Sequence, residues 1–293
     1  MTINWYPGHM HKARREIKEA LPEIDVVIEM LDARLPYSSA NPVLGKLAQH
    51  KPTLKLLSKS DLADPEITAE WIAFFNEQAN TSALPIVTSD TKTLLPIARI
   101  CQQLASQVRQ SRSVKALVIG IPNVGKSTLI NSLAGKKIAK VGDEPAVTKR
   151  QQKIQVGERL QIIDTPGVLW PRIENRNSAY RLAASGAIRN TAMDYEDVGL
   201  WTAENLLQRY PEAVMARYKL KQLPETGALL LAEVAARRGG LRAGGIVDLH
   251  RASEVLLHDL RGGQLGRISL EKPSDISLER ATEEDLIDSD ETE

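Results

Sequence analysis

Short apolar runs alternate with amphipathic stretches along the first part of the chain. The apolar runs predict buried strands at 25–31, 53–57, 84–87 and 114–120. The stretches that follow them predict helices at 42–50, 65–80, 93–110 and 126–134. Residues 153–156 and 160–163 predict an antiparallel hairpin. Strands that alternate with helices indicate an α/β fold, in which helices cover both faces of a mostly parallel sheet.

After about residue 190 the pattern changes to amphipathic helices alone. Apolar stripes predict these helices at 196–210, 212–220, 226–238 and 245–260. We therefore expect three parts: an α/β domain over 1–190 that includes a basic helix at 9–21, a small all-helical domain over 191–270, and an acidic tail over 271–293. The composition of the tail predicts a solvated, disordered end.

Charge and composition narrow the class of protein. The 293 residues carry a formal net charge of +1, but residues 283–293 hold seven acids and no base. Without those seven acids the net charge rises from +1 to +8, and a basic body of this kind suits an anionic partner such as RNA. No apolar run approaches the roughly 20 residues that span a bilayer. The single Cys101 excludes a disulfide framework, and we expect a reducing cytoplasm.

A phosphate-binding loop is the clearest motif. Residues 120–127 read Gly-Ile-Pro-Asn-Val-Gly-Lys-Ser, which matches G-x-x-x-x-G-K-S, and they lie between a predicted strand and a predicted helix. In such a loop, backbone N–H groups surround phosphate oxygens, the lysine reaches the β- and γ-phosphates, and the serine hydroxyl binds Mg²⁺. We expect phosphate contacts from these residues: Asn123, Val124, Gly125, Lys126, Ser127 and Thr128.

A second motif follows the predicted hairpin. Asp164 ends an apolar strand and precedes Thr-Pro-Gly, so its carboxylate can hold Mg²⁺ while the N–H of Gly167 senses the γ-phosphate. Thr148 lies in the loop between the two motifs and is the candidate switch threonine, which would close on Mg²⁺ when the triphosphate is bound. The alternative interpretation of Thr148 is an ordinary loop threonine in a turn.

The choice of base depends on a motif upstream of the phosphate loop. Ser58-Lys59-Ser60-Asp61 follows the predicted strand 53–57. The carboxylate of Asp61 can accept hydrogen bonds from guanine N1–H and N2–H₂ together, and adenine offers no such pair. Lys59 would lay its alkyl stem along the ring. Ser89 and Asp90 follow the next strand, where backbone contacts to guanine O6 are expected.

The order of these motifs along the chain resembles that of the circularly permuted GTPases. Among those GTPases, the chain resembles the YlqF-type ribosome biogenesis GTPase A family. The opening Trp-Tyr-Pro-Gly-His-Met at 5–10, the phosphate loop and the helical C-terminal domain carry the resemblance, which covers residues 3–265. It implies a GTPase that uses GTP, GDP and Mg²⁺, and because Val168 follows Asp-x-x-Gly we expect slow hydrolysis until a ribosomal subunit stimulates it. The implied partners are the large ribosomal subunit precursor and its rRNA, in the cytoplasm, with no DNA and no membrane.

Two departures affect the expected chemistry. The family has Asn where this chain has Ser58, and a serine can keep one hydrogen bond of the two that the amide makes. Many GTPases orient the attacking water with a Gln after Asp-x-x-Gly, but this chain has Val168 there. The resemblance implies His9 as the catalytic, water-positioning group; without the resemblance, His9 reads as a surface histidine. Asn123 is a candidate partner of a K⁺ ion or, equally, a residue that shapes its own loop.

The helical domain is basic and carries several aromatic residues. These positions are Arg189, Arg209, Arg217, Lys219, Lys221, Arg237, Arg238, Arg242, Arg251, Tyr195, Trp201, Tyr210 and Tyr218. The basic side chains at these positions would contact RNA phosphates. For the aromatic side chains, which could also stack on RNA bases, packing in the protein core is the favoured interpretation. Two functions remain as hypotheses: a GTPase switch that promotes late assembly of the large subunit, and an RNA-binding placeholder whose affinity GTP gates while hydrolysis is incidental.

Overall fold

A six-stranded sheet forms the centre of the α/β part of the molecule. A computed structural model of the chain describes residues 15–109, 111–135, 153–165, 173, 175–188 and 194–276. The strand order is β3-β2-β1-β4-β6-β5. The strands are β1 (Val26–Asp32), β2 (Thr53–Ser58), β3 (Thr81–Pro85), β4 (Val114–Gly120), β5 (Lys153–Val156) and β6 (Leu160–Asp164). Only β5, at one edge, pairs antiparallel. The structure therefore confirms the predicted α/β class and the hairpin.

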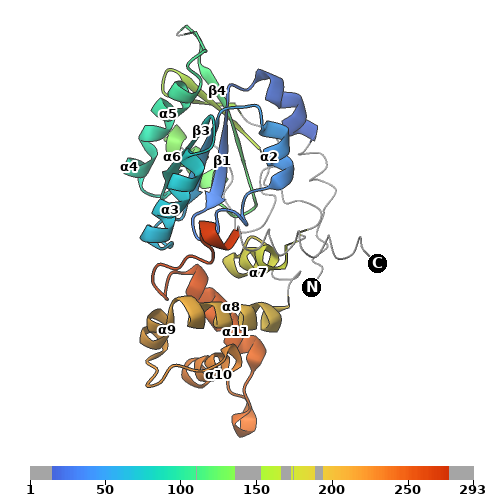
Figure 1. Cartoon of the computed structure of the whole chain (residues 1–293), viewed down its shortest axis with the longest axis vertical. Coiled ribbons are helices and arrows are strands. Elements are labelled where there is room, and N and C mark those ends of the chain that lie inside the picture. The colour runs from blue at the N-terminus through green and yellow to red at the C-terminus, as the bar shows by residue number, and fades with distance from the viewer. Residues whose placement is uncertain are drawn as a thin grey trace.

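Helices cover both faces of this sheet (Figure 1). They are α2 (Pro42–Ala48), α3 (Pro65–Asn76), α4 (Thr91–Leu94), α5 (Pro96–Leu104) and α6 (Lys126–Ala134). Asp64 begins α3 as its side chain accepts from the N–H groups of Glu66 and Ile67. Such capping satisfies donors that the first turn of a helix leaves unpaired. The predicted helix starts at 42, 65 and 126 are thus confirmed.

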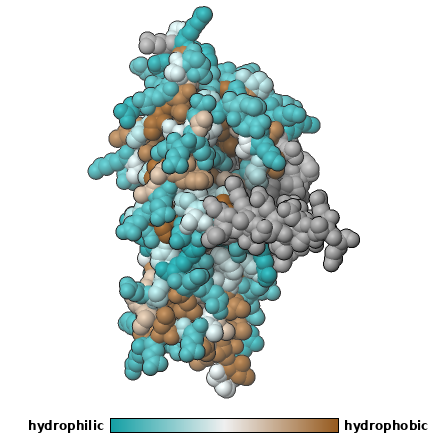
Figure 2. Space-filling model, viewed as in Figure 1, coloured by the Kyte–Doolittle hydropathy of each residue, from teal (hydrophilic) through white to brown (hydrophobic). Residues whose placement is uncertain are grey.

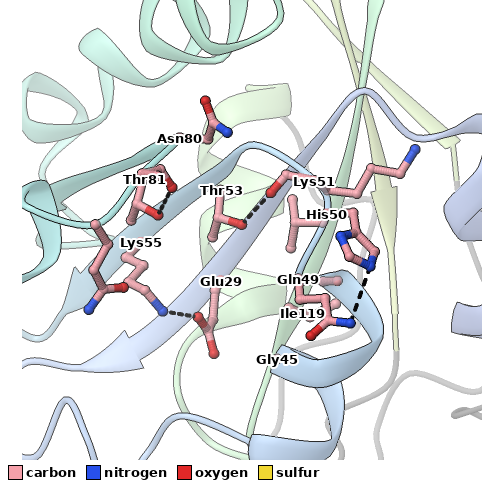
Figure 3. Close-up of a pocket in the computed structure, with 14 residues that line it drawn as sticks. Glu29, Gly45, Gln49, His50, Lys51, Thr53, Lys55, Asn80, Thr81 and Ile119 are labelled. Carbon is pink, nitrogen blue, oxygen red and sulfur yellow. Dashed lines mark hydrogen bonds and ion pairs between the residues drawn. The ribbon is translucent and has the colours of Figure 1, made fainter.

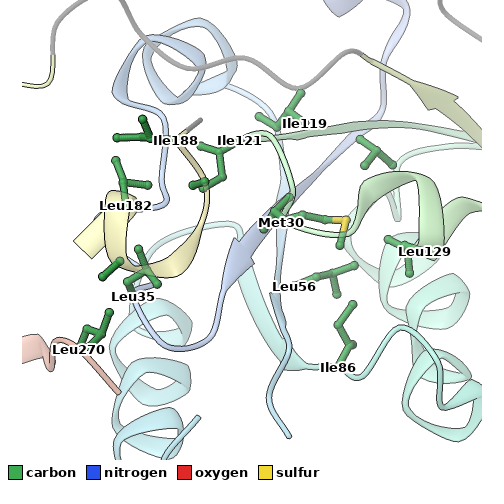
Figure 4. Packing of buried hydrophobic residues seen from close by; sticks show 14 of the residues in the cluster. Met30, Leu35, Leu56, Ile86, Ile119, Ile121, Leu129, Leu182, Ile188 and Leu270 are labelled. Carbon is green, nitrogen blue, oxygen red and sulfur yellow. The ribbon is translucent and has the colours of Figure 1, made fainter. Parts of the chain in front are cut away.

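The apolar strand residues meet the helices in one continuous core. Figure 4 shows Met30 of β1 between Leu56 and Ile119 of the neighbouring strands, with Leu129 of α6 nearby. The strands are buried along almost their whole length, because a parallel sheet with helices on both faces has no solvent-facing side. This burial holds the loops at the strand ends in place.

Two predictions of local structure were wrong. The single helix predicted at 93–110 is two helices, α4 and α5, because Pro96 lacks the N–H that a continuous helix would need. Helix α7 (Arg176–Ser185) was not predicted. Its residues from Ser178 onward are buried although they include Arg181 and Ser185, so the sequence shows no clear apolar stripe there.

Helices of the C-terminal part form a separate layer below the sheet (Figure 1). They are α8 (Tyr195–Arg209), α9 (Pro211–Tyr218), α10 (Gly227–Arg238) and α11 (Leu249–Arg261). Helices α8 and α11 approach so closely that a β-carbon on Gly199 would lie 2.2 Å from the Oγ of Ser253. Each of the four helices predicted after residue 190 has a counterpart within 194–276, and the predicted domain boundaries at 190 and 270 stay predictions.

After α11 the chain runs back to the sheet. We call residues 262–276 the return segment; Figure 1 shows it between the helical layer and the lower end of the sheet. Leu270 of this segment is fully buried and lies near Leu35, which follows β1 (Figure 4). The N–H of Leu270 donates to the carbonyl of Arg34 at 2.7 Å. The last described residues therefore belong to the packing around the nucleotide-binding end of the sheet.

Candidate nucleotide-binding site

The predicted site segments meet at one edge of the sheet. Asp32 at the end of β1 pairs with Ser58 at the end of β2, and Met30 of β1 pairs with Gly120 at the end of β4. Asp164 ends β6 beside Val118 of β4. Since these strands are parallel, their carboxyl ends face the same crevice, where ligands bind in open α/β sheets.

The phosphate loop has a conformation that few residues can adopt. Gly120, Asn123 and Gly125 have φ angles of 155°, 58° and 101°. A β-carbon on Gly120 would lie 2.7 Å from the carbonyl oxygen of Met30, so only glycine fits there. Gly125 then caps the N-terminus of α6. A loop of this kind that leads into a helix start presents backbone N–H groups to an anion.

Lys126 is buried beneath this loop. Its Nζ donates to the carbonyl oxygens of Gly120 at 3.0 Å and Ile121 at 2.7 Å. Burial lowers the pKa of Lys126 to about 8, and the nearby Asp164 carboxylate partly opposes that shift. The ammonium group is therefore held inside the phosphate loop by neutral carbonyls, in a place where an anion would stabilise its charge.

The candidate magnesium ligands are hard oxygen donors on both sides of the same crevice. Ser127 lies in the first turn of α6, and Asp164 is fully buried at the end of β6. Next to it, the Thr165 hydroxyl donates to the carbonyl of Val118 at 2.6 Å and fixes the end of β6 against β4. A hydroxyl and a carboxylate are ligands that Mg²⁺ accepts together with phosphate oxygens and water. His9, Thr148 and Gly167 lie outside the described residues.

Ser58 connects the base-reading strand to the phosphate loop. Its side chain is completely buried, and its Oγ lies 2.7 Å from the carbonyl of Val124 and 3.0 Å from the carbonyl of Leu31. One hydroxyl proton can serve only one of these acceptors at a time. The Ser58 side chain therefore connects β2 to the phosphate loop, and a base contact from Ser58, Lys59 or Asp61 stays a prediction.

Sequence analysis missed a buried charge cluster beside Lys59. Asp32 accepts two hydrogen bonds from the buried Arg34, at 2.9 and 2.7 Å, and one from the Nζ of Lys59 at 3.0 Å. Burial would raise the pKa of Asp32, but the charges of Arg34 and Lys59 outweigh it and hold the pKa below its ordinary value. Asp32 therefore fixes the head of Lys59. The signal in the sequence was an acid and an arginine directly after an apolar strand.

The remaining predicted residues lie around the same edge. Asp90 caps the short helix α4 by accepting from the N–H of Lys92, and Ser89 precedes it. The side-chain amide of Asn123 donates to the carbonyl of Gly186, the residue after α7, at 3.1 Å. Asn123 therefore links the phosphate loop to α7, a contact that neither sequence hypothesis for this residue included.

The chain is similar in sequence to known GTPases. The family described as 50S ribosome-binding GTPase matches residues 115–209. Ribosome biogenesis GTPase A of Bacillus cereus is 43% identical over 283 residues, which cover 94% of this chain and 95% of that protein. The chain belongs to the ribosome biogenesis GTPase A family. The Thermotoga maritima member is 30% identical, with 94% and 96% of the two chains covered.

Solved structures agree with this assignment. A GNP-bound YlqF from T. maritima superposes with a TM-score of 0.63 at 27% identity, covering 89% of this chain and 98% of that one. A GDP-bound YlqF gives a TM-score of 0.64 at 26% identity, with 89% and 100% covered. As a ribosome biogenesis GTPase A, the chain binds guanine nucleotide and hydrolyses GTP, and its work belongs to ribosome biogenesis.

The circular permutation of this GTPase is visible in its sheet. The family match begins at residue 115, just before the phosphate loop, while β1, β2 and β3 come earlier in the chain. Strand β1 nevertheless pairs directly with β4, so only β1 separates β2, which carries the predicted base-reading motif, from the strand that leads into the phosphate loop. Permutation changes the order of the motifs along the chain and keeps them together in space.

A separate cavity lies at the other end of the sheet, away from the phosphate loop. A cavity of about 490 Å³ lies beneath α2 and is lined by Glu29, Thr53, Lys55 and Thr81, with His50 and Lys51 at α2's end (Figure 3). Thr53 and Thr81 begin their strands, so this cavity opens toward the amino ends of the sheet. Lys55 and Glu29 form an ion pair in it. Its position separates it from the phosphate loop at the carboxyl ends.

The aromatic residues of the helical domain pack within it or against the α/β domain. Tyr218 is buried and donates to Asp259, Tyr210 contacts Asp64 of the α/β domain, and Trp201 stacks on Tyr180 of α7. Several basic residues are also paired: Arg209 with Asp275, Arg217 with Asp259, Arg237 with Glu233, Arg242 with Asp248, and Arg251 with Glu254. Lys219, Lys221 and Arg238 have no acidic ion-pair partner among the described residues. No described helix is long and apolar enough to cross a membrane.

Proposed function

We propose that this GTPase is a switch that binds the precursor of the large ribosomal subunit in its GTP form and promotes late assembly. The observation that carries the proposal is 43% identity, over nearly the whole chain, to a ribosome biogenesis GTPase A. The match to the 50S ribosome-binding GTPase family supports the choice of the large subunit. Hydrolysis to GDP would then release the protein, in the cytoplasm where subunits mature.

Different residues at the carboxyl ends of the strands bind different parts of the nucleotide in this proposal. Asp61 reads guanine, and Lys59, held by Asp32, lies along the ring. Residues 123–128 bind the phosphates, with Lys126 between the β- and γ-phosphates. Ser127 and Asp164 would hold Mg²⁺, which neutralises charge that develops on the phosphates when it is bound. Thr148 and Gly167 complete the switch in this proposal.

The source of the water-positioning group determines how fast the switch resets. Val168 carries no hydrogen-bonding atom in its side chain, so it cannot orient water. We assign this role to His9, and we assign charge stabilisation between the phosphates to a K⁺ ion at Asn123. Basal turnover is then slow, because a ribosomal surface is needed to hold His9 in place.

The same valine favours a second candidate function. If no group in the chain positions water, the protein acts as an RNA-binding placeholder whose affinity for the subunit is set by GTP, and hydrolysis is incidental. The two candidates differ in whether subunits accelerate turnover.

GTP turnover in K⁺ buffer, with and without purified large ribosomal subunits, separates them. We expect slow basal turnover and stimulation by at least about tenfold, a change of about 1.4 kcal/mol in the barrier. ATP should not be hydrolysed, and Na⁺ in place of K⁺ should lower the rate. His9→Ala should abolish the stimulation and leave the Kd for GTP unchanged.

Equal rates with and without subunits would contradict the switch and favour the placeholder, provided that GTP still changes the affinity of the protein for subunits. Equal rates in K⁺ and Na⁺ would remove the potassium ion from the mechanism. Full stimulation of the His9→Ala variant would remove His9 from it.

A further inference from the structure

The guanine-reading loop is bound directly by the return segment, from the far end of the chain. The N–H of Ile268 donates to the carbonyl of Leu62 at 2.9 Å, one residue after Asp61. The N–H of Asp64 donates to the Oγ of Ser269 at 3.1 Å. Arg267 lies 3.4 Å from the backbone carbonyl of Asp61 itself. Three consecutive residues of the return segment therefore contact the loop between Asp61 and the start of α3.

Tyr210 extends these contacts into the helical domain. It follows α8, and its hydroxyl donates to the Oδ2 of Asp64 at 3.2 Å while accepting from the N–H of Ser269 at 3.1 Å. The other oxygen of Asp64 caps α3. Through these hydrogen bonds, Asp64 connects the base-reading loop, helix α3 and the end of α8. Ser269 is fully buried, whereas Asp64 and Tyr210 are half-buried.

The other end of the return segment is anchored in the α/β domain. The buried carboxylate of Glu271 accepts from the backbone N–H groups of Tyr37 and Ser38 and pairs with the buried Arg181 at 3.2 Å. Its carbonyl accepts from the indole N–H of Trp71 at 3.2 Å. Glu271 anchors the C-terminal part of the return segment to the α/β domain, so the segment does not move as a whole. A shift of α8 at Tyr210 would therefore displace Asp64 and Leu62.

We propose that Tyr210 and Ser269 are positioning residues for guanine recognition, which make the affinity for the base depend on the placement of the helical domain. The proposal rests on the proposed reading of guanine by Asp61. Neither residue touches the base; each holds the backbone that carries Asp61. Coupling between two sites is reciprocal, so nucleotide binding strengthens the bonds of the return segment by the same factor by which those bonds strengthen nucleotide binding.

The test compares GDP with IDP, whose base lacks the 2-amino group that Asp61 accepts from. Tyr210→Phe and Ser269→Ala each remove hydrogen bonds without changing charge. We expect each to raise the Kd for GDP by about 3- to 10-fold, the range for one lost hydrogen bond. The preference for GDP over IDP should shrink, since a displaced Asp61 loses the contact that only GDP makes. In the unmodified protein, GDP should slow hydrogen exchange at the amides of Ile268 and Ser269.

Tyr218→Phe is the matched control. Tyr218 also donates to a carboxylate, that of Asp259, within the helical domain, and its hydroxyl is thus bonded to α11 rather than to the base-reading loop. Tyr218→Phe should lower the thermal stability about as much as Tyr210→Phe does. It should leave unchanged both the Kd for GDP and the ratio of the Kd values for GDP and IDP. A change in that ratio equal to the change in Tyr210→Phe would overturn the proposal, because general destabilisation would then explain both.

Asp61→Asn separates failure of the coupling from failure of base reading. If Asp61→Asn abolishes the preference for GDP while Tyr210→Phe and Ser269→Ala bind GDP like the unmodified protein, base reading stands and the coupling is overturned. If Asp61→Asn leaves the preference for GDP over IDP intact, Asp61 does not read the base. The proposed coupling is then overturned as well.

Discussion

At the scale of single residues, burial and nearby charges set the chemistry of the site. Lys126 and Asp32 are both buried, but their surroundings differ. Asp32 has two cationic partners that hold it ionised, whereas the Nζ of Lys126 is hydrogen-bonded to two neutral carbonyls, and burial lowers its pKa to about 8. Asp32 is therefore a fixed structural charge, and Lys126 is a group whose protonation depends on its ligand.

The lowered pKa of Lys126 predicts that nucleotide binding depends on pH. A bound phosphate favours the ammonium form, so binding takes up a proton wherever free Lys126 is neutral. From about pH 7 to about pH 8 the Kd for GDP should be nearly constant. Above about pH 8 it should rise by up to tenfold for each pH unit. Titration with a fluorescent GDP, kept below the pH at which guanine loses its N1 proton, measures this.

Lys126→Arg supplies the control for that titration, because a guanidinium stays protonated throughout the range. This variant should bind more weakly and show no such rise in Kd. A pH dependence equal to that of the unmodified protein would assign the titration to another group.

At the scale of secondary-structure elements, the helical domain offers a basic hollow rather than a uniformly basic face. An open cavity of about 600 Å³ lies between α9, the end of α10 and the start of the return segment, and Arg217, Lys219 and Arg238 line it. Asp259 pairs with Arg217, whereas Lys219 and Arg238 form no ion pair among the described residues and are the candidates for contact with an RNA phosphate. Figure 2 shows the mixture of polar and apolar residues on one side of this domain.

Charge reversal in this hollow should weaken binding of the subunit's RNA. Lys219→Glu combined with Arg238→Glu should raise the Kd for large-subunit rRNA and reduce the slope of log K against log salt by about two, one for each lost phosphate contact. Filter binding over a series of salt concentrations measures both quantities.

Arg242→Glu is the comparison for that double variant, because Arg242 is exposed and already paired with Asp248. It should change the salt slope less than either residue of the hollow does. An unchanged slope in the double variant would show that RNA does not enter the hollow.

At the scale of the whole molecule, the return segment joins the two layers of the structure. Glu271 is completely buried, and burial raises its pKa although Arg181 and Ser38 favour the ionised form. The carboxylate contacts the loop after β1 and helix α7, and its backbone contacts α3. One residue near the C-terminal end of the described chain therefore connects three separate parts of the α/β domain.

Removing this carboxylate should destabilise the protein strongly. Glu271→Ala leaves Arg181 as a buried cation without its acidic partner, and breaking a buried pair in this way costs about 3–5 kcal/mol. Urea unfolding, followed by circular dichroism, measures the change. Glu254→Ala removes the exposed partner of Arg251 and should cost no more than about 1 kcal/mol. Similar losses in both variants would contradict a special role for Glu271.

Local patterns were enough to predict much of the fold and the phosphate loop. Residues 114–134 form a strand, a loop and a helix within one stretch of chain, so their geometry follows from their own glycines and apolar residues. The α/β class follows from the alternation of strands and helices. Helix α7 was missed because polar residues such as Arg181 and Ser185 occupy buried positions in it, and such residues form no apolar stripe in a sequence.

Contacts between distant residues were decided only by the tertiary structure. The sequence identified Ser58, Lys59 and Asp61 as a base-reading motif, but not the bond of Ser58 to Val124 or the hold of Asp32 on Lys59. Tyr210 meets Asp64 across 146 positions and Glu271 meets Ser38 across 233. Periodicity and motif spacing report on neighbours in the chain, whereas these bonds depend on how the sheet, the helical domain and the return segment pack together. The sequence alone thus determined the nucleotide chemistry, and the packing of the chain determined what holds the guanine-reading loop in place.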